Sequence, residues 1–304
     1  MIRYLKQHQI DRNKWDSCIQ SSVQKSVYGC SWYLDVICSD WDALVEDDYE
    51  SVMPVTKNSK YLMNYIYPPF FAQQLGIFHS AAADDQVCVR FLNAIPKVYS
   101  FIEINLNTFN HNIPESFATK SNRNYILNLH PDHSVILSGY SENLTRNLKK
   151  AVKNELQINR NGSVSDVISL FRNNRGRFVE NLKDSNYQDF GQLCSAVEKN
   201  ASLKVYSVNS SSGETVAGAV FFEFMETGIF IFSGLSSTGK NLSAMPYLID
   251  TYIKDVAGKI KILDFEGSND QELARFYKSF GSTECVYLQI KKNQLPPPWK
   301  WFKN

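Results

Sequence analysis

The end of the chain, residues 261–291, constrains the fold more than any other segment. Its pattern predicts a strand, a Gly-Ser turn, a short helix and a second strand, with the regular elements over 261–265, 270–280 and 286–291. Asp264 and Glu266 stand at the end of the first strand, directly before the N-terminus of the helix. Proteins of the α/β class commonly bind ligands at such a position, because backbone N–H groups point outward there. We therefore expect a mixed α/β fold with a candidate site at these two carboxylates.

The bulk composition is that of an ordinary globular protein. The 304 residues are 43% apolar and 21% charged, enough for about two domains with buried cores. A formal net charge of +1 favours no overall affinity for polyanions, so any nucleic-acid surface would be local. The N-terminus lacks the apolar stretch of a secretory signal, and no apolar run approaches the roughly 18 residues that a membrane-spanning helix needs. We therefore expect a cytoplasmic protein without a membrane span.

The residues that bind metals or act as nucleophiles show no familiar spacing. The six cysteines are scattered and include no CxxC pair, which argues against a zinc site and a disulfide framework. No Gly-x-Ser-x-Gly or His-Glu-x-x-His motif is present, which argues against nucleophilic hydrolases and zinc proteases. His130 and His133 flank Pro131 in a segment that we interpret as a surface turn. We therefore expect reduced, mostly buried thiols and no bound metal.

The first half of the chain predicts a mixture of helices and strands. Amphipathic spacing indicates helices over 11–21, 31–39, 84–98 and 141–157. Alternation indicates strands over 41–45, 50–56, 101–106 and 124–129, the first two joined as a hairpin.

The second half predicts helices over 164–172, 190–200 and 244–256, and strands over 203–209, 215–224 and 228–233, before the final segment described above. Three antiparallel-looking strands are thus followed by a helix, a strand, a helix and a strand. Because the first half has a similar run of elements, we predict an α+β (mixed α/β) chain of two tandem domains. We place them at 1–140 and 141–292, with a Pro/Trp tail over 293–304 that packs back on the surface.

Three patches resemble the acyltransferases of the GNAT fold, in the branch of the Fem-type peptidoglycan aminoacyl transferases. The first patch comprises Asp264-Phe265-Glu266-Gly267 and Phe276-Tyr277-Lys278-Ser279-Phe280-Gly281. These are similar to the Asp-Phe-x-Gly strand end and the Phe-Lys-x-x-Phe-Gly helix of that branch. The resemblance implies two tandem GNAT-like domains, each a mixed sheet flanked by helices. It also implies transfer of an acyl or aminoacyl group to an amine.

The same resemblance implies candidate catalytic residues. Fem-type enzymes carry a Lys after the first Phe of the helix motif, whereas here Tyr277 stands there and Lys278 follows, rotated about 100° around the helix. A phenol can orient a carbonyl or relay a proton, although an aromatic side chain at this position also suits packing. Asp264 or Glu266 could accept the proton of the amine, or could instead cap the next helix. A backbone N–H near 232–234 would stabilise the developing oxyanion.

The second patch is Tyr67-Pro68-Pro69-Phe70-Phe71-Ala72-Gln73-Gln74-Leu75-Gly76. It resembles a Pro…Gln-x-Leu-Gly segment in the first domain of related GNAT-like proteins. Gln73 and Gln74 offer donors and acceptors that suit a peptide or amide substrate. We therefore expect them, with Tyr67, to contact the amine acceptor in a cleft between the two domains. The alternative is that the two amides bond to backbone in an irregular loop.

The third patch is a helix with four cations, Arg146, Lys149, Lys150 and Lys153. Their spacing of i, i+3, i+4 and i+7 puts them on one helical face. The patch resembles the Arg-containing helix that leads into the second Fem-type domain. The cations could hold a diphosphate or the acceptor end of a tRNA, and the alternative is a solvated surface.

Residues 234–241 read G-x-x-x-x-G-K between a predicted strand and a predicted helix, as in a phosphate-binding loop. Asn241 replaces the Ser or Thr that an NTPase needs for magnesium, and the chain that follows is too short for its parallel sheet. In GNAT enzymes the corresponding turn holds the pyrophosphate of coenzyme A. The candidate cofactor residues are then Gly239, Lys240, Asn241 and Ser243, although Asn241 and Ser243 stand where that pattern has glycine or alanine. We expect an acyl-CoA or an aminoacyl-tRNA as donor, with weak or no binding of acetyl-CoA.

The alternative to an N-acyltransferase is a catalytically silent GNAT-like binding module. The unmatched loop and the displaced Lys both favour it. A donor must bind if the chain is an enzyme, so donor binding helps to separate the two functions.

Overall fold

The computed structural model describes residues 1–60, 62–80, 84–179, 182–267 and 269–297. The chain forms two compact units, Met1–Asn122 together with the strand from Val286 onward, and Arg123–Cys285. The division therefore falls within β7 (Ala118–Asn128), and β13 (Thr283–Asn293) leads back to the first unit. The boundary expected from the sequence lies later, after residue 140. The predicted Pro/Trp tail spans 293–304, and its residues 298–304 lie outside the described residues.

The first unit contains a mixed sheet with short helices. Its elements are β1 (Ile2–Leu5), α1 (Arg12–Ser21), α2 (Ser31–Ile37), β2 (Trp41–Glu46), β3 (Ser51–Lys60), β4 (Met63–Ile66), β5 (Phe78–His79), α3 (Val87–Asn93) and β6 (Tyr99–Asn105), with 3-10 turns at η1 (Gln7–Gln9) and η2 (Val27–Gly29). The strand order is β1-β2-β3-β4-β6-β13, and β5 pairs with β3. β4 and β6 run parallel, and the other pairs of this unit run antiparallel.

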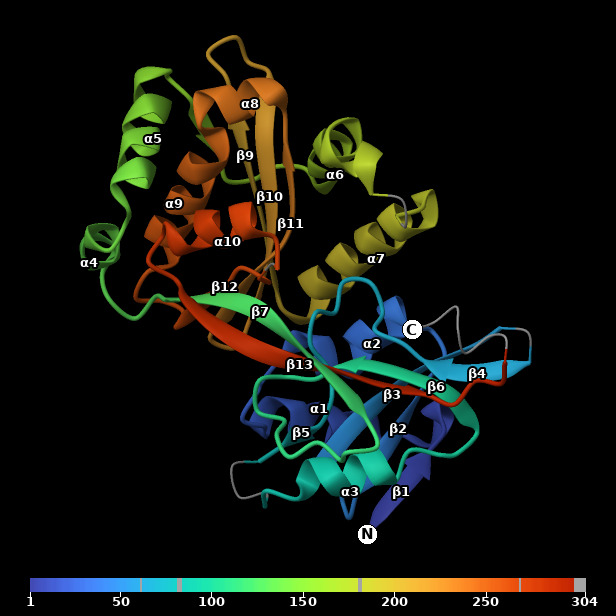
Figure 1. The fold of residues 1–304 in the computed structure, drawn as a ribbon. Coiled ribbons are helices and arrows are strands. Elements are labelled where there is room, and N and C mark those ends of the chain that lie inside the picture. The colour runs from blue at the N-terminus through green and yellow to red at the C-terminus, as the bar shows by residue number, and fades with distance from the viewer. Residues whose placement is uncertain (61, 81–83, 180–181, 268, 298–304) are drawn as a thin grey trace. The chain divides into compact units, whose positions relative to one another are not determined.

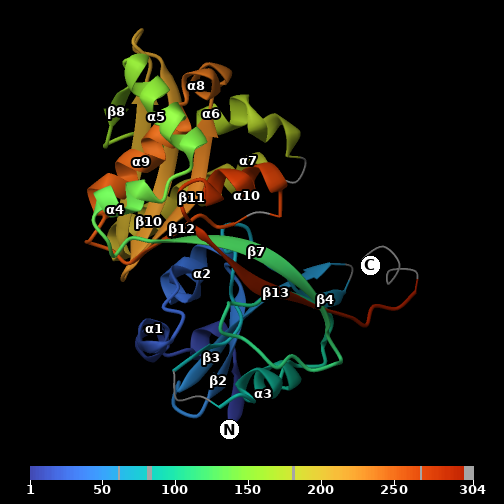
Figure 2. The ribbon, with the colours of Figure 1, turned by 60° about the vertical axis from the view of Figure 1, so that its left-hand side comes forward.

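Alternation along β2 places helices on both faces of the first sheet. Trp41 is fully buried and packs against Trp15 of α1, with ring centroids 4.9 Å apart. Leu44 instead belongs to the core cluster that contains Phe91 of α3. Because successive side chains of a strand point to opposite faces, α1 and α3 cover opposite sides of this sheet (Figure 2).

The second unit contains a second mixed sheet. Its elements after β7 are α4 (His133–Ser138), α5 (Glu142–Lys153), β8 (Gln157–Asn159), α6 (Val164–Asn173), η3 (Arg175–Phe178), α7 (Asp184–Asn200), β9 (Ser202–Asn209), β10 (Thr215–Phe224), β11 (Thr227–Leu235), α8 (Ser237–Leu242), α9 (Ala244–Val256), β12 (Ile262–Asp264) and α10 (Gln271–Lys278). The strand order is β7-β12-β11-β10-β9-β8. β11 and β12 run parallel, and their neighbours in this unit run antiparallel.

α9 and α7 lie on opposite sides of β10 in the second sheet (Figure 1), and neighbouring residues of β10 contact them. Phe221 stacks on Tyr252 of α9, with ring centroids 3.7 Å apart. Phe222 points to the other face and contacts Phe190 of α7. The aromatic strand is thus buried on both sides, as its almost uninterrupted apolar sequence requires.

Most predicted elements are confirmed, and several boundaries were wrong. The hairpin of β2 and β3 and the helix α9 are as expected. The helix expected over 141–157 ends at Lys153, because Glu155 adopts a left-handed φ of 53° and Gln157 begins β8. The helix expected over 84–98 is shorter and comprises only α3 (Val87–Asn93). Asp84 lies before the helix, where its carboxylate accepts the N–H of Gln86.

Other elements were missed or misread. The sequence pattern does not predict four strands that are each only two to four residues long, β1, β4, β5 and β8. α7 begins at Asp184, before the predicted start at residue 190. His133 is not in a surface turn: it opens α4, and its Nε2 lies 2.8 Å from Oδ1 of Asp250 on α9. A partner distant in sequence fixes this helix, so local pattern could not predict it.

β11 and β12 separate at their C-terminal ends. Their last pair joins Ile229 and Asp264, after which β12 ends while β11 continues to Leu235. The end of β12 therefore opens toward α10 without a parallel partner. This is the location at which the sequence predicted a ligand site.

Candidate functional site

Asp264, the last residue of β12, has a fixed and partly buried carboxylate. Its Oδ1 accepts the backbone N–H of Glu266 at 2.7 Å, and its Oδ2 accepts Nδ2 of Asn124 at 3.2 Å. Asn124 is buried on β7, the antiparallel neighbour of β12. Both donors are neutral, and Asp264 has no ion pair in the part of the chain that the structure describes. Its charge is therefore held in place without being neutralised.

Desolvation by burial raises the pKa of Asp264 to about 6, and the two hydrogen bonds oppose this shift only in part. The carboxylate is thus mostly ionised at neutral pH, yet it binds a proton far better than an exposed Asp. A pKa close to the working pH is the property that a general base needs. A carboxyl group with such a pKa can both take up and release a proton near neutral pH.

The turn after Asp264 is pressed against β7. Glu266 and Gly267 both have positive φ values, 54° and 39°. A Cβ at Gly267 would lie 2.2 Å from Cα of Asn124 and 2.3 Å from the carbonyl oxygen of Arg123, so only glycine fits. This close approach brings the Asn124 side chain within reach of Asp264.

Tyr277 lies on α10 beside this turn. Its ring stacks on Phe265, with centroids 4.9 Å apart and planes inclined by 19°. Burial, and next the charge of Glu266, raise the pKa of Tyr277 to about 12. The phenol therefore stays protonated at physiological pH, and it can donate a hydrogen bond to an oxygen that gains negative charge. Asp264, Glu266 and Tyr277 thus lie close enough for the two carboxylate charges to act on the phenol.

Lys278 points to a different group of residues. Its Nζ lies 2.8 Å from Oε2 of Glu284 and 5.5 Å from the ring centroid of Tyr125. The hydrogen bond to Glu284 raises the pKa of Lys278, which keeps it charged. A charged, paired Lys is a poor proton acceptor, so Asp264 suits this role better.

The segment expected to hold a phosphate forms the short helix α8. The N–H of Gly239 donates to Oγ of Ser236 at 3.0 Å, and that of Lys240 donates to the carbonyl of Ser236 at 2.9 Å. A Cβ at Gly239 would lie 2.2 Å from the carbonyl oxygen of Val216, so this glycine serves packing against β10. Lys240 and Asn241 are exposed, and Ser243 is a buried left-handed residue between α8 and α9. These residues do not fit the pyrophosphate of coenzyme A.

We accordingly expect acetyl-CoA to bind with a Kd weaker than about 1 mM, equivalent to about −4 kcal/mol. The physical reason is that N–H groups already bonded within α8 cannot also hold phosphate oxygens. Isothermal titration calorimetry measures this directly. Submicromolar binding that is abolished by Ser243→Trp would show that this segment does hold coenzyme A.

The predicted cationic face lies on α5. Arg146, Lys149, Lys150 and Lys153 are all on this helix, and their side chains are at least partly exposed. The opposite face is buried through Leu144 and Ala151, so the four cations point to solvent as the spacing indicates. The surface is available for a polyanion, and it has no structural role in the core.

The predicted acceptor residues lie in the first unit. Nε2 of the buried Gln74 donates to Oε1 of Gln73 at 2.8 Å. Oε1 of Gln74 is buried without a hydrogen-bond partner among the described residues. Tyr67 lies beside Cys38, where burial raises its pKa. The two amides therefore bond to each other, while Tyr67 lines a separate pocket discussed below.

Asn124 belongs to the site, although the sequence pattern does not predict it. It lies 140 residues from Asp264 and reaches it because β7 pairs with β12. No motif marks it in the sequence. Only the strand order of the second sheet identifies it.

No helix of the described residues is both long and apolar enough to cross a membrane. Within the same residues, no group of three or more His, Cys, Asp or Glu side chains is arranged to hold a metal ion.

The fold is shared with several solved structures, although no protein-family model and no curated protein matches the sequence. FemX is similar with a TM-score of 0.66 and 10% identity, covering 99% of both chains. L-PGS from Bacillus licheniformis is similar with a TM-score of 0.57 and 11% identity, over 96% of this chain and 95% of that one. A tandem GNAT protein from the clavulanic acid biosynthesis pathway is similar with a TM-score of 0.57 and 6% identity, over 97% and 99%. The chain therefore has the tandem GNAT fold of FemX, which confirms the fold class predicted from the sequence.

Proposed function

We propose that this chain transfers an acyl or aminoacyl group to an amine, with Asp264 as the general base. The observation that carries the proposal is the partly buried carboxylate at the end of β12, whose pKa is raised to about 6. It stands where β11 and β12 separate, in a fold shared with FemX and a tandem GNAT protein. A structural carboxylate would instead be expected to pair with a cation or to keep a low pKa.

In the proposed reaction, the amine nitrogen attacks the carbonyl carbon of the activated acyl group. The new C–N bond forms, the proton of the amine passes to Asp264, and the bond from the carbonyl carbon to the donor breaks. The leaving group then takes up the proton. We assign Tyr277 to the carbonyl oxygen, because its phenol stays protonated and can donate a hydrogen bond. Burial, and next the charge of Glu266, keep that proton on the phenol.

The donor that these residues favour is an aminoacyl-tRNA. The α8 segment does not fit coenzyme A, as argued above, whereas α5 presents four cations to solvent, Arg146, Lys149, Lys150 and Lys153. A tRNA acceptor end carries closely spaced phosphates that such a face attracts, with a strong dependence on salt. Arg146 is the cation best suited to a bidentate phosphate contact.

The pH dependence tests the role of Asp264. We expect the transfer rate to rise with pH through an apparent pKa of about 6, because the carboxylate must be ionised to accept a proton. Total tRNA charged with labelled amino acids serves as donor, and a set of primary amines serves as acceptor. A carboxyl ¹³C titration of Asp264 gives the same pKa without any substrate. A flat rate profile between pH 5 and pH 8, in a chain that transfers label, would show that Asp264 is not the base.

One observation favours a catalytically silent binding module instead. The Lys that Fem-type enzymes use is displaced here, and Lys278 is held by Glu284. In that case a charged tRNA would bind and protect the chain in thermal shift, yet no label would reach any amine.

A further inference from the structure

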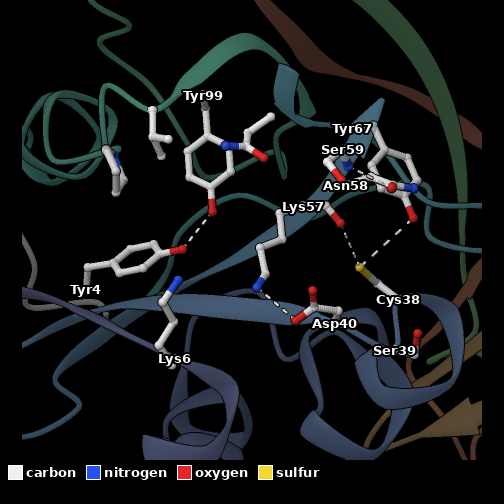
Figure 3. A pocket seen from close by; sticks show the side chains of 13 residues that line it. Tyr4, Lys6, Cys38, Ser39, Asp40, Lys57, Asn58, Ser59, Tyr67 and Tyr99 are labelled. Carbon is white, nitrogen blue, oxygen red and sulfur yellow. Dashed lines mark hydrogen bonds and ion pairs between the residues drawn. The ribbon is translucent and has the colours of Figure 1, made fainter. Parts of the chain in front are cut away.

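A second polar site lies in the first unit, and of the candidate site residues discussed above only Tyr67 lines it. It is a pocket of about 460 Å³, within the size range of small-molecule sites. Its lining includes Tyr4, Lys6, Asp40, Lys57, Tyr67 and Tyr99, drawn from β1, β3, β6 and the segments beside β2 and β4 (Figure 3). Its lining includes charged groups of both signs.

A buried carboxylate behind the pocket fixes its two cations. Asp42 is 1% exposed and accepts four hydrogen bonds. They come from Tyr4 Oη at 2.5 Å, Lys57 Nζ at 3.0 Å, Lys6 Nζ at 3.1 Å and the N–H of Gln7 at 3.1 Å. Because both ammonium groups bond the same oxygen, Oδ2, they are close neighbours. Because Asp42 is buried and bonds both ammonium groups, its role is to position Lys6 and Lys57.

The two tyrosines complete a directed chain of hydrogen bonds. Tyr4 gives its single proton to Asp42, so Tyr99, whose Oη lies 2.6 Å away, must donate to Tyr4. Burial raises the pKa of both phenols, which therefore stay neutral. The chain adds rigidity to the wall of the pocket without adding charge.

Lys6 and Asp40 keep unused hydrogen-bonding capacity. An ammonium has three donors, and Lys6 uses one of them on Asp42 while its side chain remains 53% exposed. Lys57 bonds both Asp42 and Asp40, at 3.0 and 2.8 Å. Asp40 is 77% exposed and has no second cation among the described residues. The pocket thus offers N–H donors next to a free carboxylate oxygen.

The charges at the pocket cancel, since two lysines face two aspartates. A ligand with a single net charge gains little from such a site, whereas a ligand that carries both charges can match it. The spacing is short, because Lys57 itself touches Asp40. The complementary anion and cation must therefore be separated by about one carbon atom.

We propose that this pocket binds a free α-amino acid as its zwitterion. The carboxylate takes the spare donors of Lys6 and Lys57, and the ammonium group takes Asp40. The side chain lies against the ring of Tyr67 and the apolar Pro96 and Val98, which also line the pocket. The site is independent of the transfer chemistry proposed for Asp264.

L-phenylalanine is the probe that tests the zwitterion requirement. Its binding is measured by calorimetry and by the amide chemical shifts of the full chain. N-acetyl-L-phenylalanine lacks the ammonium group, and phenethylamine lacks the carboxylate. We expect each to bind at least about tenfold more weakly than phenylalanine, the difference of one lost charge-assisted contact. Equal binding of all three, or no binding of phenylalanine or L-alanine up to about 10 mM, would overturn the proposal.

Matched variants separate this pocket from a general surface effect. Asp40→Asn and Lys6→Gln should each weaken phenylalanine binding about fivefold or more, because each removes one half of the charge match. Asp48→Asn and Lys14→Gln are the controls, since this pair is similarly exposed in the same unit, with Nζ and Oδ1 2.6 Å apart. They should leave binding unchanged. If all four variants bind like the wild type, the pocket is not the site.

Discussion

Replacing Asp264 with Asn is expected to lower the rate of aminoacyl transfer by about 100- to 10,000-fold, the usual contribution of a general base. The amide keeps the size of the side chain and can still accept the N–H of Glu266. It cannot accept the proton of the amine. Initial rates with charged tRNA as donor and primary amines as acceptors measure the loss.

The same substitution is expected to stabilise the protein at pH 7. The folded pKa of Asp264, about 6, lies above the ordinary value of 3.8. Its contribution to stability is therefore complete below pH 4 and is lost as pH rises through 6, with a cost at pH 7 of about 2–3 kcal/mol. Asn removes this cost but loses the hydrogen bond from Asn124, whose Nδ2 would face another NH2 group, so we expect a net gain of about 1–2 kcal/mol and a Tm higher by about 2–6 °C.

Two comparisons make this result specific. At pH 4, where Asp264 is already protonated in the folded protein, the Tm difference should nearly vanish. Asp250→Asn alters another partly buried carboxylate of the second unit, which accepts the hydroxyl of Tyr140, and should leave the transfer rate within about threefold. An Asp264→Asn variant with full activity, or one that is destabilised equally at both pH values, would mean that the carboxylate has a structural role.

Gly267→Ala is expected to give the largest loss of stability, about 3–5 kcal/mol, because two penalties combine. The positive φ of 39° is strained for any residue with a Cβ, and the new methyl group would lie 2.2 Å from Cα of Asn124. Chemical denaturation with urea measures the loss. The turn must move away from β7, so the hydrogen bond from Asn124 to Asp264 should break as well.

Gly213→Ala and Gly258→Ala are matched controls for this prediction. Both glycines have positive φ values, 85° and 74°, but a Cβ at either would meet nothing within 4 Å. Each should therefore cost only about 1 kcal/mol, the strain of the left-handed conformation alone. If Gly267→Ala costs no more than these two, the turn does not depend on close contact with β7.

The sequence determined the elements whose residues stabilise each other locally. Apolar residues on one face of 244–256 give α9, and the alternation on both sides of an acidic turn gives the β2–β3 hairpin. The strand end at Asp264 and the helix after it were also predictable, because Asp270 caps α10 through the N–H groups of Glu272 and Leu273. These interactions span a few residues and leave a pattern in the sequence.

The same reasoning explains how much of the candidate site was predictable. Asp264, Glu266 and Tyr277 come from one continuous segment, and the structure brings them together. The α8 segment has the spacing of a phosphate loop, but Gly239 is required by its close approach to the carbonyl of Val216 on another strand. Spacing alone cannot distinguish a glycine that a ligand needs from one that packing needs.

Only the tertiary structure decided the features that depend on strand order. Asn124 reaches Asp264 because β7 lies next to β12, and burial at that position, rather than any charged neighbour, raises the pKa of the carboxylate. Likewise, Lys6 and Lys57 become neighbours through the buried Asp42, although they come from β3 and from the segment after β1. Desolvation and long-range contacts depend on which segments pack together, and that information is spread over the whole chain rather than held in any one motif.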